Sequence, residues 1–267
     1  APLHNDPVPS WGCGAQFPFA KQGSFEFPWT YGVRTVRVDF PLNYDNTKPY
    51  KLLFGMHCMN GSGEQVQKEG YYGLKPLDIY NEFIFLAPEG NGEIAPWGMY
   101  DYLLFDELLA FMKENACIDE SRVFSTGFSW GAMFTNGLAW NHQNELRAVA
   151  VFETAAINIW LPEYLGLPIA WWAVEALQDP ICTPEMARYA RDVILSHNGP
   201  GGTDASWEPA EEYPGWGPHV CYEYQYVDPN YPTTWCTQNG GHMWDHKDPG
   251  ETQTWVPWAV WEFLNKF

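Results

Sequence analysis

Short apolar segments alternate with segments of helical periodicity along this chain, and no other feature of the sequence restricts its fold as strongly. A short apolar run between turn residues is typical of a strand, whereas apolar positions three and four apart are typical of a helix. Strands are predicted at 33–40, 51–57, 82–87, 122–128, 148–152, 169–174, 220–227 and 233–237, and helices at 102–116, 132–140, 185–195 and 255–267. This alternation predicts an α/β fold whose mostly parallel sheet is covered by helices on both faces.

The sequence contains no internal repeat, low-complexity tract or long linker, so a single domain over residues 1–267 is the simplest prediction. Residues 1–32 are rich in Gly, Pro and aromatic residues, and we expect them to form an irregular segment packed on that domain. The strand at 33–40 alternates apolar and polar residues, which is typical of an edge strand.

The charge and the hydropathy of the chain exclude two classes of partner. Acidic residues outnumber basic ones 33 to 14, and a formal net charge of -19 argues against nucleic acid, which binds to basic surfaces. No stretch approaches the roughly 18 consecutive apolar residues of a transmembrane helix, so no membrane partner is expected. Aromatic residues make up 17% of the chain, which suits sugar or aromatic ligands but also an aromatic core. We expect the protein to act as a monomer.

The cysteines indicate an oxidising compartment. An even number of six, with no C-x-x-C pair, fits three disulfides in a secreted protein. Two of them flank a turn between predicted strands and are expected to pair across a hairpin, which leaves two other pairs. The expected pairs are Cys221–Cys236, Cys13–Cys58 and Cys117–Cys182. The chain begins at Ala1 without an apolar leader, as a mature secreted protein would, and carries one glycosylation sequon at Asn60.

One motif points to catalysis. Gly127-Phe128-Ser129-Trp130-Gly131 matches G-x-S-x-G and lies between a predicted strand and a predicted helix. This is the setting of a nucleophile elbow, in which the two glycines relieve crowding and the serine hydroxyl stands above the sheet. The alternative is a glycine-rich turn with a solvent-facing serine. We favour the nucleophile because the strand–turn–helix context agrees with the motif.

A serine nucleophile needs a base, and the base needs an orienting acid, which follow the serine in the order acid, then histidine. His242 comes after the last predicted strand in a loop that begins Gly240-Gly241, whereas the alternative, His219, precedes its strand. Asp179 lies in the loop after the strand at 169–174. Glu175 is the alternative acid, since it lies closer to that strand.

The transition state of such a reaction needs backbone N–H donors for a developing oxyanion. Trp130 is expected to supply one donor at the start of a helix. Cys58 or Met59, in the glycine-containing loop after the strand at 51–57, is expected to supply the other. A reactive thiol at Cys58 is the competing interpretation.

Metal and cofactor chemistry receive little support from the sequence. His242 and His246 are four residues apart with an acid between them, which resembles an inverted zinc-peptidase motif. That motif requires a stable helix, whereas glycines precede this segment and Pro249-Gly250 follow it. No phosphate-binding glycine motif occurs, so neither a metal nor a cofactor is expected.

Residues 117–131 (CIDESRVFSTGFSWG) resemble the signature of secreted feruloyl esterases of the first carbohydrate esterase family and their polyhydroxybutyrate-depolymerase-like relatives. Gly12-Cys13-Gly14, the segment 53–57, and Trp235-Cys236 followed by Gly240-Gly241-His242 are similar to other blocks of that family. The resemblance implies an α/β-hydrolase fold with Ser129 as nucleophile, Asp179 as acid and His242 as base.

The resemblance further implies that a secreted serine esterase releases ferulate or p-coumarate from a feruloylated polysaccharide or oligosaccharide, through an acyl-enzyme. A flat aromatic acyl group needs an apolar slot, and Trp160 and Trp244 lie close enough in sequence to the expected catalytic residues to line it. Acetylxylan esterase and polyester depolymerase activities are alternatives within the family. A non-catalytic carbohydrate-binding protein is an alternative of another class, against which the complete set of three catalytic residue types argues.

Overall fold

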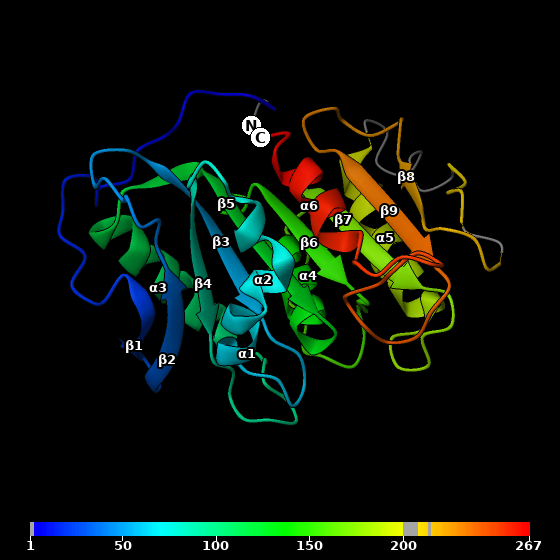
Figure 1. Cartoon of the computed structure of the whole chain (residues 1–267), viewed down its shortest axis with the longest axis horizontal. Helices are drawn as coiled ribbons and strands as arrows, with labels where there is room; N and C mark the ends of the chain where they lie inside the picture. The colour runs from blue at the N-terminus through cyan, green and yellow to red at the C-terminus, as the bar shows by residue number, and fades with distance from the viewer. Residues whose placement is uncertain (1–2, 200–207, 213–214) are drawn as a thin grey trace.

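Nine strands form one mixed sheet in the computed structural model, which describes residues 3–199, 208–212 and 215–267 (Figure 1). The order of the strands across the sheet is β1-β2-β4-β3-β5-β6-β7-β9-β8. The strands are β1 (Gln22–Trp29), β2 (Gly32–Asp39), β3 (Tyr50–Met56), β4 (Phe83–Pro88), β5 (Ile118–Phe128), β6 (Ala148–Phe152), β7 (Ala170–Ala176), β8 (Val220–Glu223) and β9 (Thr233–Gln238).

The centre of the sheet is parallel, as the sequence predicted. The pairs β4–β3, β3–β5, β5–β6, β6–β7 and β7–β9 are parallel, whereas β1–β2, β2–β4 and β8–β9 are antiparallel. Every residue of β4, β6, β7 and β9 is buried, because helices cover both faces of these strands. The carboxyl ends of the parallel strands therefore share one edge of the sheet, where loops are free to carry functional groups.

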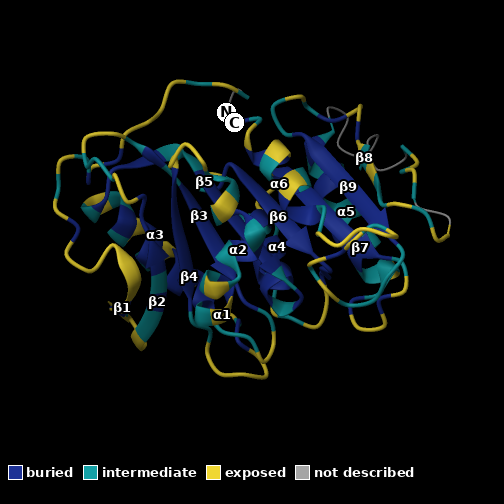
Figure 2. Cartoon of the chain, viewed as in Figure 1, coloured by how far each residue is buried: buried dark blue, intermediate teal, exposed yellow. Residues whose placement is uncertain are grey.

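Helices cover each face of the sheet and enclose two apolar cores. The helices are α1 (Gly63–Lys68), α2 (Gly70–Gly73), α3 (Asp101–Asn115), α4 (Trp130–Asn141), α5 (Pro184–Asn198) and α6 (Val256–Leu264), with a short 3-10 turn at Lys75–Leu77. One core packs α3, α4 and α5 against the sheet, and the other packs α1, α2 and α6 on the opposite face. The buried residues run along the central strands between these layers (Figure 2). None of the described helices combines the length and apolar character that a membrane crossing requires.

The N-terminal part of the chain differs from its prediction. Residues 22–29, within the segment predicted as irregular, form β1 and pair with β2. The strand predicted at an edge is therefore covered, and β1 takes the edge position. Phe25 and Phe27 alternate with exposed residues and bury their rings in the first core, a pattern that the glycine-rich and proline-rich flanks concealed. Residues 1 and 2 of the predicted segment lie outside the described residues.

Two disulfides are present in the described part of the chain. Cys221 pairs with Cys236 directly across β8 and β9, which confirms the hairpin prediction. The other two pairs were wrong: Cys13 bonds Cys117, and Cys58 and Cys182 are free. The reason is topological. The N-terminal segment runs beside the start of β5, where the N–H of Ser10 donates to the carbonyl of Ile118 at 2.9 Å, whereas Cys58 follows the carboxyl end of β3.

Candidate active site

A sharp turn between β5 and α4 presents Ser129 at the carboxyl edge of the sheet. Its backbone adopts φ 54° and ψ -119°, a strained conformation for a non-glycine residue. The two motif glycines permit this turn, because a Cβ at Gly127 would lie 2.5 Å from the Gly131 backbone and one at Gly131 would lie 2.1 Å from the carbonyl oxygen of Met56. The backbone at Ser129 therefore forms the sharp strand–turn–helix elbow that the sequence predicts.

The structure brings His242 and Asp179 to this serine. His242 lies in the loop after β9, and its Nε2 is 2.8 Å from Ser129 Oγ. Its Nδ1 is 2.6 Å from Asp179 Oδ2, and Asp179 lies in the loop after β7. An imidazole placed between a hydroxyl and a carboxylate can accept the proton of the hydroxyl while the carboxylate fixes its tautomer and orientation.

Asp179 is held in its ionised form within this arrangement. Its Oδ1 accepts the N–H groups of Ile181 at 2.7 Å and Cys182 at 3.1 Å. Burial opposes ionisation, but the hydrogen bonds from His242 and from the Ile181 N–H outweigh it and lower the pKa of the Asp179 carboxyl. The two residues that the sequence left as alternatives lie elsewhere. Glu175 is fully buried and has no hydrogen bond to His242, and His219 pairs with Asp248 at 2.8 Å.

The loop after β3 faces the serine and is fixed by His57. The N–H of Gly90 donates to His57 Nε2 at 2.8 Å, so the proton of the neutral ring is on Nδ1, which donates to the carbonyl of Cys58 at 2.8 Å. Burial lowers the pKa of His57, which keeps the ring neutral. The indole N–H of Trp97 donates to the His57 carbonyl at 2.8 Å. Sequence reasoning missed Trp97 as a support, because an isolated Trp carries no signal that separates it from the core.

A cavity of about 290 Å³ opens beside Ser129 and His242. Its lining is mostly apolar and comes from the loops after β3, β6, β7 and β9, from the β5–α4 turn, and from α4 and α5. Asn60 and Asn158 add polar groups beside the serine and histidine. The lining residues are Cys58, Met59, Asn60, Phe128, Ser129, Trp130, Met133, Ala155, Asn158, Ile181, Cys182, Met186 and His242.

The three residues predicted for an oxyanion site all line this cavity, whereas the two predicted for substrate binding do not. Cys58, Met59 and Trp130 surround the serine, and the N–H of Trp130 lies at the start of α4, where a helix has no internal acceptor for it. Trp160 is 46% exposed and packs edge-on against Tyr102, and Trp244 packs against Tyr72. Their contact with substrate stays a prediction.

The two histidines that resembled a metal motif have different partners. His242 contacts Asp179 and Ser129, whereas His246 Nε2 lies 2.5 Å from the carboxyl group of Glu153. Carboxyl oxygens of Glu153, Glu175 and Asp179 lie within 4.8 Å of one another. The segment between the histidines is not helical, so their side chains do not share one helix face.

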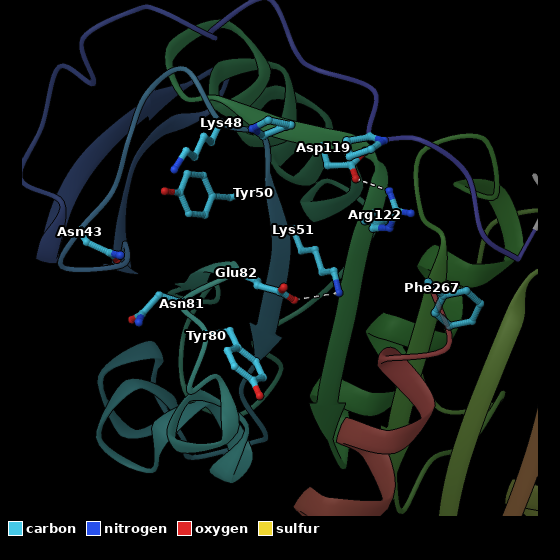
Figure 3. Close-up of a pocket in the computed structure, with 12 residues that line it drawn as sticks. Asn43, Lys48, Tyr50, Lys51, Tyr80, Asn81, Glu82, Asp119, Arg122 and Phe267 are labelled. Atoms are coloured by element: carbon cyan, nitrogen blue, oxygen red, sulfur yellow. Dashed lines mark hydrogen bonds and ion pairs between the residues drawn. The ribbon is translucent and has the colours of Figure 1, made fainter.

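A larger cavity, of about 430 Å³, lies at the opposite edge of the sheet (Figure 3). It is formed by the amino ends of β3 and β5, by the segment before β4 and by the ring of Phe267. Its charges are paired: Lys51 lies 3.3 Å from Glu82, and Arg122 lies 2.5 Å from Asp119. Because it brings no nucleophile next to a base, the smaller cavity beside Ser129 is the candidate active site.

Comparisons with known proteins agree with this site. No protein-family model matches the chain. The chain is 31% identical to feruloyl esterase D of Neurospora crassa over 276 residues, covering 97% of this chain and 91% of that protein. It is 29% identical to feruloyl esterase C of Emericella nidulans, covering 98% of this chain and 93% of that protein.

Two solved structures share its fold. A mutant of the feruloyl esterase module from Clostridium thermocellum, complexed with sinapinate, has a TM-score of 0.61 and 13% identity, covering 98% of this chain and 92% of that chain. An acetyl xylan esterase from Aspergillus awamori has a TM-score of 0.62 and 13% identity, covering 92% of this chain and all of that chain. The predicted α/β-hydrolase fold is thereby confirmed.

Proposed function

Because the chain belongs to the feruloyl esterase family of carboxylic ester hydrolases, we propose that it releases ferulate or p-coumarate from plant cell-wall arabinoxylan through an acyl-enzyme on Ser129. One observation carries the proposal: Ser129, His242 and Asp179 form a hydrogen-bonded line that ends in a mostly apolar cavity. The proposed nucleophile, base and acid follow the ends of β5, β9 and β7 in that order.

Acylation begins when Ser129 Oγ attacks the ester carbonyl carbon and its proton passes to His242 Nε2. Asp179 accepts the Nδ1–H of the resulting imidazolium and stabilises its charge. The carbonyl oxygen gains a negative charge, which the N–H of Trp130 and an N–H of Cys58 or Met59 stabilise. The tetrahedral species collapses as His242 returns the proton to the sugar oxygen, which leaves as the alcohol.

Deacylation repeats these steps with water. His242 removes a proton from a water molecule, whose oxygen attacks the acyl carbonyl carbon, and the same N–H groups stabilise the second oxyanion. Ser129 then leaves with the proton from His242, and the hydroxycinnamate acid is released. The balance is one water consumed for one ester bond cleaved.

The character of the cavity supports an aromatic acyl group. Met59, Met133, Ile181 and Met186 offer apolar surface on several sides, and thioether sulfur makes favourable contacts with aromatic rings. An acetyl group would leave most of about 290 Å³ unfilled. Asn60 and Asn158 supply the few polar groups that orient a ligand in an apolar pocket.

The cross-linked chain suits an extracellular site of action. Disulfides persist in oxidising compartments, and two are formed among the described residues. We therefore propose that the protein is secreted and meets its polysaccharide substrate outside the cell.

The test of the mechanism is Ser129→Ala. The variant should lose at least about 10³-fold in turnover of methyl ferulate, because the nucleophile is absent, while its melting temperature stays close to that of the wild type. A fluorophosphonate should label the wild type at Ser129 and leave the variant unlabelled. Retention of a tenth of the wild-type turnover would exclude Ser129 as the nucleophile.

The test of the substrate is a panel of esters. We expect kcat/KM to be highest for methyl ferulate and methyl p-coumarate, and lower for p-nitrophenyl acetate. A preference for the acetate would favour an acetylxylan esterase, and hydrolysis of polyhydroxybutyrate alone would favour a polyester depolymerase. A protein that binds arabinoxylan but neither hydrolyses an ester nor reacts with the fluorophosphonate would be a carbohydrate-binding protein.

A further inference from the structure

A second group of ionisable side chains is buried directly behind Asp179. Glu153 and Glu175 are fully buried, and His246 is 1% exposed. Glu153 follows the end of β6, Glu175 lies on β7 and His246 lies in the loop after β9. These residues lie at the ends of β6, β7 and β9, whose following loops also line the candidate active site. None of them takes part in the proposed reaction.

Glu153 is fixed at the centre of this group. One carboxyl oxygen accepts the N–H of Ala176 at 2.9 Å, and the other lies 2.5 Å from His246 Nε2. Its carboxyl group also lies close to those of Asp179 and Glu175, with one oxygen of each residue within 4.8 Å of the others. These contacts place Glu153 between Asp179 and His246.

The backbone of Glu153 supports a specific role. Its φ is 52°, in the left-handed region that non-glycine residues rarely adopt, and its N–H donates to the carbonyl of Val174 at 3.0 Å. Ser129, at the end of the adjacent strand, has a φ of 54°. Strain of this kind persists where surrounding structure enforces it and concentrates at functional sites.

The protonation state of Glu153 follows from its surroundings. Burial raises the pKa of both Glu153 and Glu175. Burial lowers the pKa of His246 to about 3, so this ring is neutral. Glu153 therefore carries a proton, whereas Asp179 is ionised. A neutral carboxyl group beside a carboxylate acts as a hydrogen-bond donor to it.

We propose that Glu153 is a positioning residue: its neutral carboxyl group, held by His246 and by the Ala176 N–H, hydrogen-bonds Asp179 and fixes that carboxylate toward His242. The inference rests on the proposed catalytic role of Ser129, His242 and Asp179. The ionisable groups that face Glu153 are Glu175 on β7, Asp179 and Cys182 in the loop that follows, and His246 after β9. Behind them, His242 acts on Asp179 and His246, and Glu185 and Arg188 on α5 act on Glu175.

The test compares two substitutions at this position. Glu153→Leu removes the donor, so kcat for methyl ferulate should fall roughly tenfold or more with little change in KM, because a misplaced base slows the chemical steps. Glu153→Gln restores an N–H donor for Asp179 and an oxygen for the Ala176 N–H, and should recover kcat to within about threefold of the wild type.

The pH profile of Glu153→Gln decides between a neutral and an ionised Glu153. If the residue is neutral, the amide changes no charge and the acid limb of kcat/KM stays where it is in the wild type. If the residue is ionised, the amide removes a negative charge close to His242, and the acid limb moves to lower pH by about one unit. That shift would overturn the proposal, even if the leucine variant does not fold.

Asp39 provides the matched control. It is a buried carboxyl group that hydrogen-bonds Tyr71 at 2.8 Å and Lys75 at 2.6 Å, far from the cavity, on β2. Asp39→Leu should lower the melting temperature but leave kcat and the acid limb unchanged. Equal kcat losses in the Asp39 and Glu153 leucine variants would show that Glu153 acts only through stability.

The role of Glu153 can be tested separately from the catalytic role of Ser129. Full activity in Ser129→Ala would refute the proposed reaction itself, whereas inactive Ser129→Ala together with fully active Glu153→Leu would refute only the role of Glu153. Loss of activity in EDTA, with recovery on adding a divalent cation, would show that the three clustered carboxylates hold a metal and would overturn the neutral Glu153.

Discussion

At the scale of single residues, the two carboxyl groups that the sequence offers as the acid, Asp179 and Glu175, have opposite environments. Asp179 receives hydrogen bonds from His242 and two backbone N–H groups, which lower its pKa. Glu175 receives no backbone hydrogen bond among the described residues, and burial raises its pKa. An ionised carboxylate stabilises an imidazolium that donates its Nδ1–H better than a neutral acid does, so these environments favour Asp179 as the acid.

The first prediction at this scale concerns Asp179. Asp179→Asn should lower kcat by about 10⁴-fold, because the amide favours the wrong tautomer of His242. Glu175→Gln should keep kcat within a few-fold of the wild type, since it replaces a neutral acid by a neutral amide. Steady-state kinetics on methyl ferulate measure both variants. The reverse result would make Glu175 the acid, and two mild effects would show that neither residue serves His242.

Sequence could predict which three side chains form the hydrogen-bonded line at Ser129 but not the walls of the cavity beside it. Ser129, Asp179 and His242 each follow a predicted strand, and the required chain order left few candidates. Met133 and Met186 lie in α4 and α5, where an apolar residue is as expected of a core position as of a binding site. Glu153 escaped notice because a single acid after a buried strand carries no pattern until neighbouring strands are placed beside it.

At the scale of secondary structure elements, the β5–α4 turn is the part of the fold least tolerant of change. Gly131→Ala should destabilise the protein by roughly 1–3 kcal/mol, because its Cβ would press on the Met56 carbonyl at the end of β3. It should also lower kcat, because Ser129 and the Trp130 N–H move with the turn.

Urea unfolding and kinetics on methyl ferulate measure the two effects. Gly98→Ala is the control, since a Cβ there meets nothing closer than 4.0 Å. Equal stability of the two alanine variants would mean that the turn adapts without strain.

The β8–β9 hairpin supports the loop that carries His242. The Cys221–Cys236 disulfide closes a sequence separation of 15 residues, and such a cross-link stabilises a protein by about 3 kcal/mol. Replacing both cysteines by serine should therefore lower the free energy of unfolding by about that amount, measured by urea unfolding. As a check on the pairing, the denatured, unreduced wild type should expose two reactive thiols, those of Cys58 and Cys182. If no reactive thiol were detected, all six cysteines would be paired, as the sequence analysis expected.

Elements with a clear period could be predicted, and elements without one could not. The buried strands β3, β4, β6 and β7 are mostly apolar runs, and each was located to within a few residues. The α1–α2 region was missed because Tyr71 and Tyr72 have φ angles of 55° and 58°, a left-handed path that hydrophobic periodicity does not encode. Residues 118–121, which precede the strand predicted at 122–128, also belong to β5, and the pairing with β3 shifts register there.

At the scale of the whole molecule, the buried group around Glu153 makes stability fall on both sides of a mildly acidic optimum. In the unfolded chain His246 binds a proton below its ordinary pKa of 6.5, whereas in the folded protein burial lowers its pKa to about 3. The unfolded state therefore holds more protons between these values, and stability falls as the pH falls through this range. Glu153 and Glu175 have the opposite effect, because their pKa values are raised in the folded protein. Above the ordinary pKa of 4.5 the unfolded chain releases protons that the folded protein keeps, so stability also falls as the pH rises.

Substitutions at His246 and Glu175 separate the two opposite contributions to the pH dependence of stability. His246→Gln keeps an N–H that can donate to the Glu153 carboxyl oxygen but cannot titrate, so its melting temperature should fall less than that of the wild type between pH 6.5 and 4. Glu175→Gln should have the opposite effect, with a smaller loss of melting temperature than the wild type as the pH rises above 4.5. His4→Gln is the control, because it removes an exposed histidine and should leave both slopes unchanged. Differential scanning calorimetry across this pH range measures all three variants. If His246→Gln kept the wild-type slope on the acid side, His246 would be protonated in the folded protein and Glu153 would be its anionic partner, and the neutral donor to Asp179 would be lost as an explanation.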